Sequence, residues 1–142
     1  MALGIGSTGP TTLFSDVTKS VVGSMGHHGV RRLIAVTGVG AGETRGHGGF
    51  LYDRVIYPLF TRNRYRDKER QEGVIAASDL DWIIVRPAAF SDRAAVGQPE
   101  VHLKIESNVV LRRITPAEVA KFVVEQVEDD RYLHAMPFIG HP

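Results

Sequence analysis

"RRLIAVTG" at residues 31–38 and "LDWIIVRP" at residues 80–87 are the two apolar runs that decide the fold. Each is short and is bounded by charged residues, glycine or proline, which is typical of buried strands in a parallel sheet. Between them the charged residues 64–78 predict a helix, with Lys68 and Glu72 four residues apart on its polar side. Strand, helix and strand in this order predict a βαβ unit with a right-handed crossover.

A second helix is predicted on the N-terminal side of this unit. Apolar residues recur at helical spacing from Phe14 to Met25, and Gly26 and Gly29 are candidate stops. We therefore expect an amphipathic helix to precede the first buried strand.

The C-terminal side carries a third helix and weaker strand signals. Residues 115–118 read Thr-Pro-Ala-Glu, which is a capping box with proline at the first helical position. "EVHLKIES" at 100–107 predicts an edge strand or an arm, and "AMPFIG" at 135–140 predicts a return to the sheet. Because no repeat or linker interrupts the chain, we expect one α/β domain over residues 1–142.

Composition excludes several classes of function. The chain has 142 residues, is 43 % hydrophobic and has 17 Lys+Arg against 16 Asp+Glu, so no nucleic-acid partner is indicated. It has no cysteine, which excludes disulfides and thiolate chemistry, and its six histidines have no carboxylate spacing that completes a metal site. No apolar run approaches the length of a membrane span. We expect a soluble cytoplasmic protein without metal, nucleic acid or membrane as partner.

The segment "GIGSTG" at residues 4–9 fits the G-x-G-x-x-G pattern of dinucleotide-binding loops. That pattern works after a strand and before a helix, with an acidic residue about 20 positions on that holds the ribose. Only residues 1–3 precede Gly4, and "VVGSMGHHG" at 21–29 holds no acid. In this context the match does not predict a phosphate-binding turn.

Three longer stretches together resemble one family. They are residues 2–25 with 28–42, residues 67–87, and residues 114–140. In this order they resemble the C-terminal two thirds of NAD(P)H-binding atypical short-chain dehydrogenases, the NmrA-like group that includes the flavin reductase/biliverdin reductase B type. The resemblance implies a partial Rossmann-like parallel sheet with flanking helices, the C-terminal portion of a doubly wound fold. It also implies that the family's phosphate-binding glycine motif lies upstream of Met1, so that the domain is N-terminally incomplete.

The resemblance implies positions for the cofactor along two strand ends. Leu3 and Gly4 would lie beside its adenosine half, and the hydroxyl of Thr37 would lie near the nicotinamide, where it could orient a carbonyl or a water. Gly38 would let a ring approach the backbone, although the flavin reductase relatives have a serine there. The alternative for Thr37 is a hydrogen bond to its own loop.

The resemblance also assigns candidate catalytic residues. Lys68 matches the lysine of the Tyr-x-x-x-Lys pair, which binds the nicotinamide ribose and lowers the tyrosine pKa. Tyr65 lies three residues before it rather than four, and a solvated helix face explains Tyr65, Lys68 and Glu72 equally well.

The end of the second strand matches the family as well. Arg86 and Pro87 stand where the family has "RP", and the backbone of Ala88 and Ala89 would then pass the nicotinamide carboxamide. The alternative is a strand terminated by proline, with Arg86 in a surface ion pair.

The function expected from this resemblance is hydride transfer from NADP or NAD to a small acceptor such as a flavin or quinone, with Thr37, Tyr65 and Lys68 as catalytic residues. Two alternatives stay open, a non-catalytic NAD(P)-sensing regulator of the NmrA type and a scaffold that binds no cofactor. We also expect a homodimer or strand-exchanged assembly, because an incomplete sheet leaves a strand edge uncovered.

Overall fold

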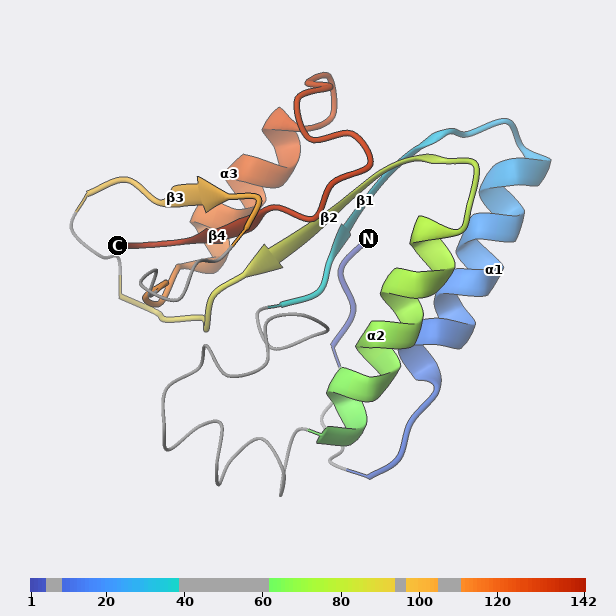
Figure 1. The fold of residues 1–142 in the computed structure, drawn as a ribbon, viewed down its shortest axis with the longest axis horizontal. Coiled ribbons are helices and arrows are strands. Elements are labelled where there is room, and N and C mark those ends of the chain that lie inside the picture. The colour runs from blue at the N-terminus through green and yellow to red at the C-terminus, as the bar shows by residue number, and fades with distance from the viewer. Residues whose placement is uncertain (5–8, 39–61, 94–96, 105–110) are drawn as a thin grey trace.

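The computed structural model of the protein describes residues 1–4, 9–38, 62–93, 97–104 and 111–142, with the side chains of residues 62–65 left out of the description. The elements are α1 (Leu13–His27), β1 (Arg32–Val36), α2 (Arg62–Ala76), β2 (Asp81–Pro87), β3 (Glu100–His102), α3 (Pro116–Glu125) and β4 (Phe138–Gly140). Figure 1 traces them from the N-terminus to the C-terminus.

The four strands form one sheet in the order β1-β2-β4-β3. Strands β1, β2 and β4 are parallel, and β3 runs antiparallel to β4 at one edge. β1 and β2 are in register from Arg32 opposite Asp81 to Val36 opposite Val85. The predicted βαβ unit is thus β1-α2-β2, and the expected return to the sheet and edge strand are β4 and β3.

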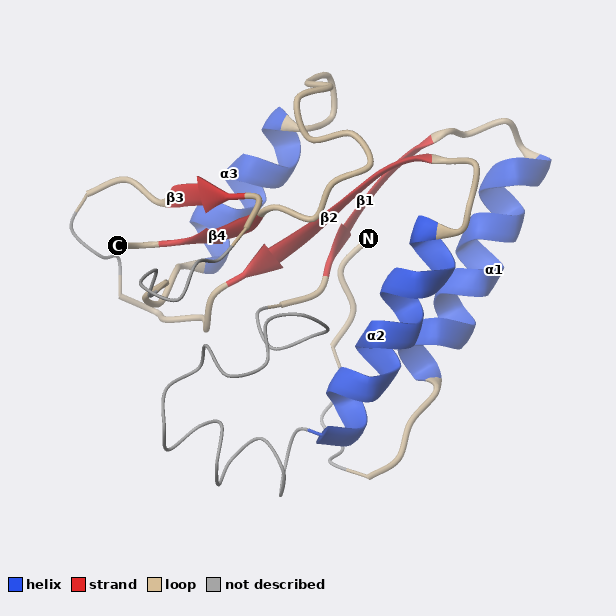
Figure 2. Ribbon diagram, viewed as in Figure 1, coloured by secondary structure: helices blue, strands red, loops and turns tan. Residues whose placement is uncertain are grey.

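Helices cover both faces of the sheet, and Figure 2 shows α1 and α2 side by side with α3 apart from them. Because side chains alternate along a strand, β1 and β2 present one set of residues to each face. Leu33, Trp82 and Ile84 pack with Ile75 of α2 in one cluster. A second cluster on the α3 face contains the buried residues Ile34, Ile83, Val85, Ala88, Ile114, Val119, Phe122 and Ile139.

A buried aspartate of α2 joins the two helices of the first face. α1 begins after Thr12, whose side chain makes no capping hydrogen bond. Instead the carboxylate of Asp67 accepts the backbone N–H of Phe14 at 2.8 Å and the hydroxyl of Ser15 at 2.6 Å. Arg70 holds the same carboxylate at 3.2 Å. The start of α1 is therefore capped by its neighbour rather than by its own sequence.

α3 begins with the capping box that its sequence predicts. The Thr115 hydroxyl accepts the backbone N–H of Glu118, and the Glu118 carboxylate accepts the Thr115 N–H at 2.8 Å. Glu118 also contacts the Nε2 of His141, which is 2 % exposed, at 2.9 Å. This carboxylate therefore joins the start of α3 to the end of the chain beyond β4.

Of the two glycines predicted to stop the first helix, one lies beyond the end of α1. Gly29 has a φ of +68°, which suits glycine just beyond a helix end, whereas Gly26 lies inside α1. In the part of the chain that the structure describes, no helix is both long and apolar enough to cross a membrane.

Candidate functional site

The carboxyl ends of β1 and β2 lie side by side at one edge of the sheet (Figure 1). The backbone N–H of Thr37 donates to the carbonyl of Val85 at 2.9 Å, so pairing continues to the last residue before Gly38. Gly38 has a φ of +150°, and a Cβ built there would meet no described atom closer than the Pro87 carbonyl oxygen at 4.0 Å. Ligands of open α/β sheets bind at this edge, and a glycine such as Gly38 has no Cβ that would keep a ligand from the backbone.

A buried ion pair between β2 and α2 lies next to these strand ends. The guanidinium of Arg86 donates from Nε to Glu72 Oε1 at 3.1 Å and from a terminal nitrogen to Oε2 at 2.7 Å. The Thr37 hydroxyl donates to Glu72 Oε1 at 2.7 Å. The side chains of Arg86 and Glu72 are only 7 % and 6 % exposed. Residues from β1, α2 and β2 are thereby fixed in one hydrogen-bonded cluster.

This cluster corrects two interpretations of the sequence. The alternative of a solvated helix face is wrong for Glu72, which is buried at 4 % exposure. The alternative of a surface ion pair for Arg86 is also wrong, because the pair is buried, with the guanidinium carbon 5.2 Å from the Phe138 ring centre. The signal in the sequence was Arg86 itself, since an arginine that ends a buried strand needs an anionic partner.

The hydroxyl of Thr37 has a partner that neither expectation named, and its place beside the nicotinamide stays a prediction. It does not bond its own loop among the described residues, because its proton goes to Glu72 on α2. Nor is that proton available to a substrate carbonyl while this bond is made, since a hydroxyl has one O–H donor.

Lys68 lies on α2 one turn before Glu72, and its Nζ is 4.7 Å from the centre of the Phe14 ring. Tyr65 is within the same helix, but its side chain lies outside the described residues. The expected approach of the Tyr65 ring to Lys68 therefore stays a prediction.

The first residues of the chain line the outer side of β1. Ala2 forms a parallel bridge with Val36, whose N–H donates to the Met1 carbonyl at 2.9 Å. Leu3 is half-buried and Gly4 is exposed at the same end of the sheet as Thr37. Residues 5–8 of the "GIGSTG" segment lie outside the described residues.

The chain leaves β2 through Pro87, Ala88 and Ala89. The N–H of Ala88 donates to the Ile139 carbonyl at 2.8 Å, and the carbonyl of Ala89 accepts the Ile114 N–H at 3.1 Å. Ala88 is buried and Ala89 is exposed. Two of the four backbone polar groups of this pair are thus used by the protein itself.

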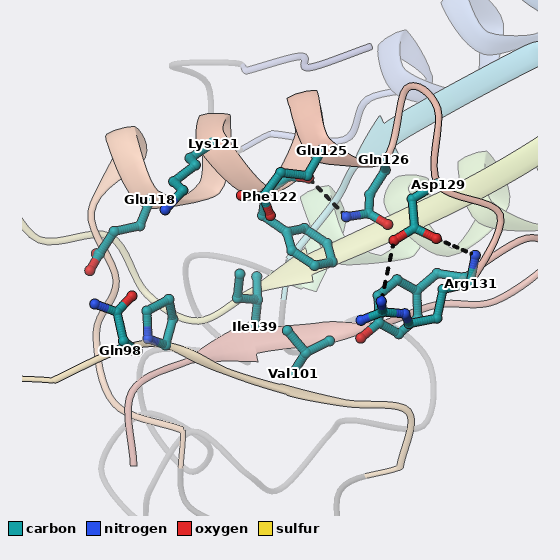
Figure 3. A pocket seen from close by; sticks show the side chains of 12 residues that line it. Gln98, Val101, Glu118, Lys121, Phe122, Glu125, Gln126, Asp129, Arg131 and Ile139 are labelled. Atoms are coloured by element: carbon teal, nitrogen blue, oxygen red, sulfur yellow. Dashed lines mark hydrogen bonds and ion pairs between the residues drawn. The ribbon is translucent and has the colours of Figure 1, made fainter.

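A separate hollow of about 410 Å³ lies on the α3 face, between α3 and the β3-β4 edge (Figure 3). Phe122, Val101, Tyr132 and Ile139 line it, and Lys121 stands on its rim. No residue predicted from the resemblance contributes to it. Within the described ranges, no group of three or more His, Asp or Glu residues could hold a metal ion.

Comparisons with known proteins agree on one family and one fold. A family model described as NAD(P)H-binding matches residues 1–130. No curated protein matches the sequence.

Several solved structures match, three of them at 21 % identity or less. The oxidoreductase ylbE from Lactococcus lactis has a TM-score of 0.75 at 17 % identity, with 99 % of this chain and 61 % of that chain covered. ChuY, an anaerobillin reductase from Escherichia coli O157:H7, has a TM-score of 0.73 at 21 % identity, with coverage of 96 % and 62 %. A wide-type short-chain dehydrogenase/reductase from Veillonella parvula, in complex with NADP, has a TM-score of 0.70 at 15 % identity, with coverage of 94 % and 61 %.

These likenesses confirm the Rossmann-like arrangement of the sheet and its flanking helices. The chain spans about three fifths of the length of the structures that it matches, 61–62 % in these three.

Proposed function

This chain belongs to the NAD(P)H-binding family, and on that premise we propose that it is an NAD(P)H-dependent oxidoreductase. The proposed reaction passes hydride from C4 of the nicotinamide to a small acceptor such as a flavin or quinone. The cofactor supplies the hydride chemistry when bound, while the protein orients the ring and excludes water.

The observation that carries the proposal is the adjacency of the ends of β1 and β2. Thr37 directly follows β1, Arg86 is the penultimate residue of the neighbouring parallel strand β2, and Glu72 hydrogen-bonds both side chains. Two strand ends joined by hydrogen bonds, with Gly38 directly after Thr37, suit a planar ring that rests on backbone. Preorganised groups of this kind support catalysis better than mobile ones.

The residues present fit the nicotinamide half of the cofactor. Gly38 offers approachable backbone, and Thr37 and the turn from Arg86 to Ala89 would hold the nicotinamide. Lys68 would bind the ribose hydroxyls with Tyr65 beside it.

Leu3 and Gly4 would lie along the adenosine half. Both belong to residues 1–4, which run along the outer side of β1 near its carboxyl end. The choice between NADP and NAD is part of the test, because no residue on this edge is assigned to the 2′-phosphate.

The test begins with binding. Isothermal titration of NADPH and NADH into the full chain is expected to give saturable binding, and the tighter ligand identifies the cofactor. The bound cofactor is also expected to raise the melting temperature, since a ligand that binds only the folded state stabilises it. Absence of both effects would favour the scaffold alternative.

A matched pair of lysine variants locates the binding site. Lys68→Met removes the proposed ribose contact and is expected to weaken NADPH binding by on the order of 10- to 100-fold, the range for a hydrogen bond to a charged group. Lys121→Met is the control, because Lys121 is a helical lysine on the opposite face of the sheet. Equal effects of the two variants would contradict the proposed site.

Turnover separates the remaining alternatives. NADPH oxidation with a panel of flavins and quinones is expected for the oxidoreductase. Saturable binding without oxidation of any acceptor would favour an NmrA-type sensor instead.

A further inference from the structure

The Thr37 hydroxyl uses its single proton in a hydrogen bond within the protein. Thr37 Oγ1 lies 2.7 Å from Glu72 Oε1, and the same carboxylate takes two bonds from the Arg86 guanidinium. A carboxylate in such a pair is an acceptor without a proton to give, so the hydroxyl must be the donor of the bond. Release of that proton would leave a buried charged acceptor one bond short, which is unfavourable.

The lone pairs of Thr37 Oγ1 are then the only part of the hydroxyl that can serve a ligand. They can accept an N–H or O–H but cannot polarise a carbonyl. Thr37 is 9 % exposed and directly follows β1, and among the described atoms a Cβ built at the adjoining Gly38 would meet nothing closer than the Pro87 carbonyl oxygen at 4.0 Å. Glu72 therefore makes Thr37 Oγ1 a hydrogen-bond acceptor toward a ligand, although Glu72 need not contact the ligand itself.

We propose that Thr37 is a specificity-determining residue whose hydroxyl oxygen accepts the N–H of the nicotinamide carboxamide. This inference rests on the proposed function and sharpens it. The carboxamide carries the only donor on the nicotinamide ring, and the neighbouring turn already uses its Ala89 carbonyl to hold Ile114. An acceptor with a fixed direction at Thr37 selects the amide over a ketone and sets which way the ring substituent points.

The test compares NADP, or NAD if the chain binds NAD more tightly, with the matching 3-acetylpyridine analogue, in which a methyl ketone replaces the carboxamide and removes the N–H donor. Isothermal titration of the oxidised forms measures affinity without turnover. The wild-type chain is expected to bind the carboxamide cofactor more tightly than the analogue. In Thr37→Val the ratio of the two affinities is expected to fall by on the order of 3- to 10-fold, the value of one neutral hydrogen bond.

Two further variants keep the comparison sound. Thr37→Ser retains the hydroxyl and is expected to keep the wild-type ratio. Thr37→Cys takes the place of Thr37→Val if that variant fails to fold. Its sulfur accepts hydrogen bonds only weakly, so it is also expected to lower the ratio of the two affinities. Because the chain has no cysteine, the new thiol has no disulfide partner within it. Circular dichroism melts of each variant monitor the fold.

The outcomes separate this inference from the function on which it rests. If the wild-type chain binds neither dinucleotide, the proposed function fails and the inference fails with it. If the wild-type chain binds both, but shows no preference or a preference that Thr37→Val and Thr37→Cys preserve, the inference alone is overturned.

Discussion

Glu72 is the residue on which the candidate site depends most. It is buried, and it holds the ends of β1 and β2 through Thr37 and Arg86. A buried ion pair adds little net stability over a well-packed apolar pair, but the loss of one partner leaves an uncompensated charge. The cluster therefore mainly fixes the positions of the two strand ends. It adds to stability only while all of its side chains are present.

Glu72→Ala is expected to lower the free energy of unfolding by about 3–5 kcal/mol, because Arg86 remains buried without an anion. Urea unfolding measures the loss. The double variant Glu72→Leu with Arg86→Met is expected to recover most of it, and Arg66→Ala, on an exposed part of α2, to change it by less than about 0.5 kcal/mol. A double variant as unstable as Glu72→Ala would contradict the uncompensated-charge explanation.

Glu118 provides a pH-dependent contribution at the start of α3. The backbone N–H of Thr115, and then its hydroxyl, hold the pKa of Glu118 below its ordinary value of 4.5. A carboxyl whose pKa is lowered by folding contributes stability that is complete above its unfolded pKa and is lost as the pH falls through its folded pKa.

The stability difference between the wild type and Glu118→Gln is therefore expected to shrink as the pH falls below 4.5. Urea midpoints of both proteins between pH 3 and pH 7 measure this. A difference that does not change with pH would mean that the charge of Glu118 has no part in the capping box.

At the scale of elements, α1 and α2 behave as one unit because Asp67 caps the start of α1. The apolar spacing of α1 was readable from sequence, but its cap was not. Asp67 lies 53 residues from Phe14, and it resembled any other charge in a polar helix. Local patterns carry no information on such tertiary capping.

Asp67→Ala is expected to lower the free energy of unfolding by about 2–4 kcal/mol, the combined value of a lost cap and a buried hydrogen bond to a charged group. Amide hydrogen exchange at Phe14 is expected to accelerate, which locates the effect at the first turn of α1. Lys19→Ala, on the exposed side of α1, is the control and is expected to leave both measurements unchanged. Unchanged exchange at Phe14 in Asp67→Ala would contradict the capping role.

At the scale of the whole molecule, the sequence predicted the layers better than the site. The apolar runs at residues 31–38 and 80–87 predicted β1 and β2, because burial on two faces leaves a continuous apolar signal. The short β3 and β4 were less definite, since three residues each carry little periodicity. The burial of Glu72 could not be predicted, because burial of a charge depends on a partner that only the folded chain brings near.

The edge of the sheet beside β1 has a consequence for assembly. Among the described residues, β1 is bordered on its outer side only by Met1 and Ala2, which pair with its carboxyl end. Met1 uses its backbone groups toward β1, so the alternation of a strand turns the N–H and carbonyl of Ala2 away from the sheet. Outward groups that pair with no described residue, as at Ala2, are a template for another strand.

We propose that two copies of the 142-residue chain pair along this edge, as a homodimer or a strand-exchanged assembly. Light scattering coupled to size exclusion is expected to give twice the 15.6 kDa mass of the chain at micromolar concentration. Ala2→Pro removes the outward N–H and leaves the Met1 contacts with β1 available, so it is expected to shift the assembly toward monomer. Because Ala2 is exposed, this change is not expected to disturb the core. Urea unfolding of the monomeric variant checks that its fold is intact. A wild-type chain that stays monomeric, or a dimer that Ala2→Pro leaves intact, would rule out pairing through this edge.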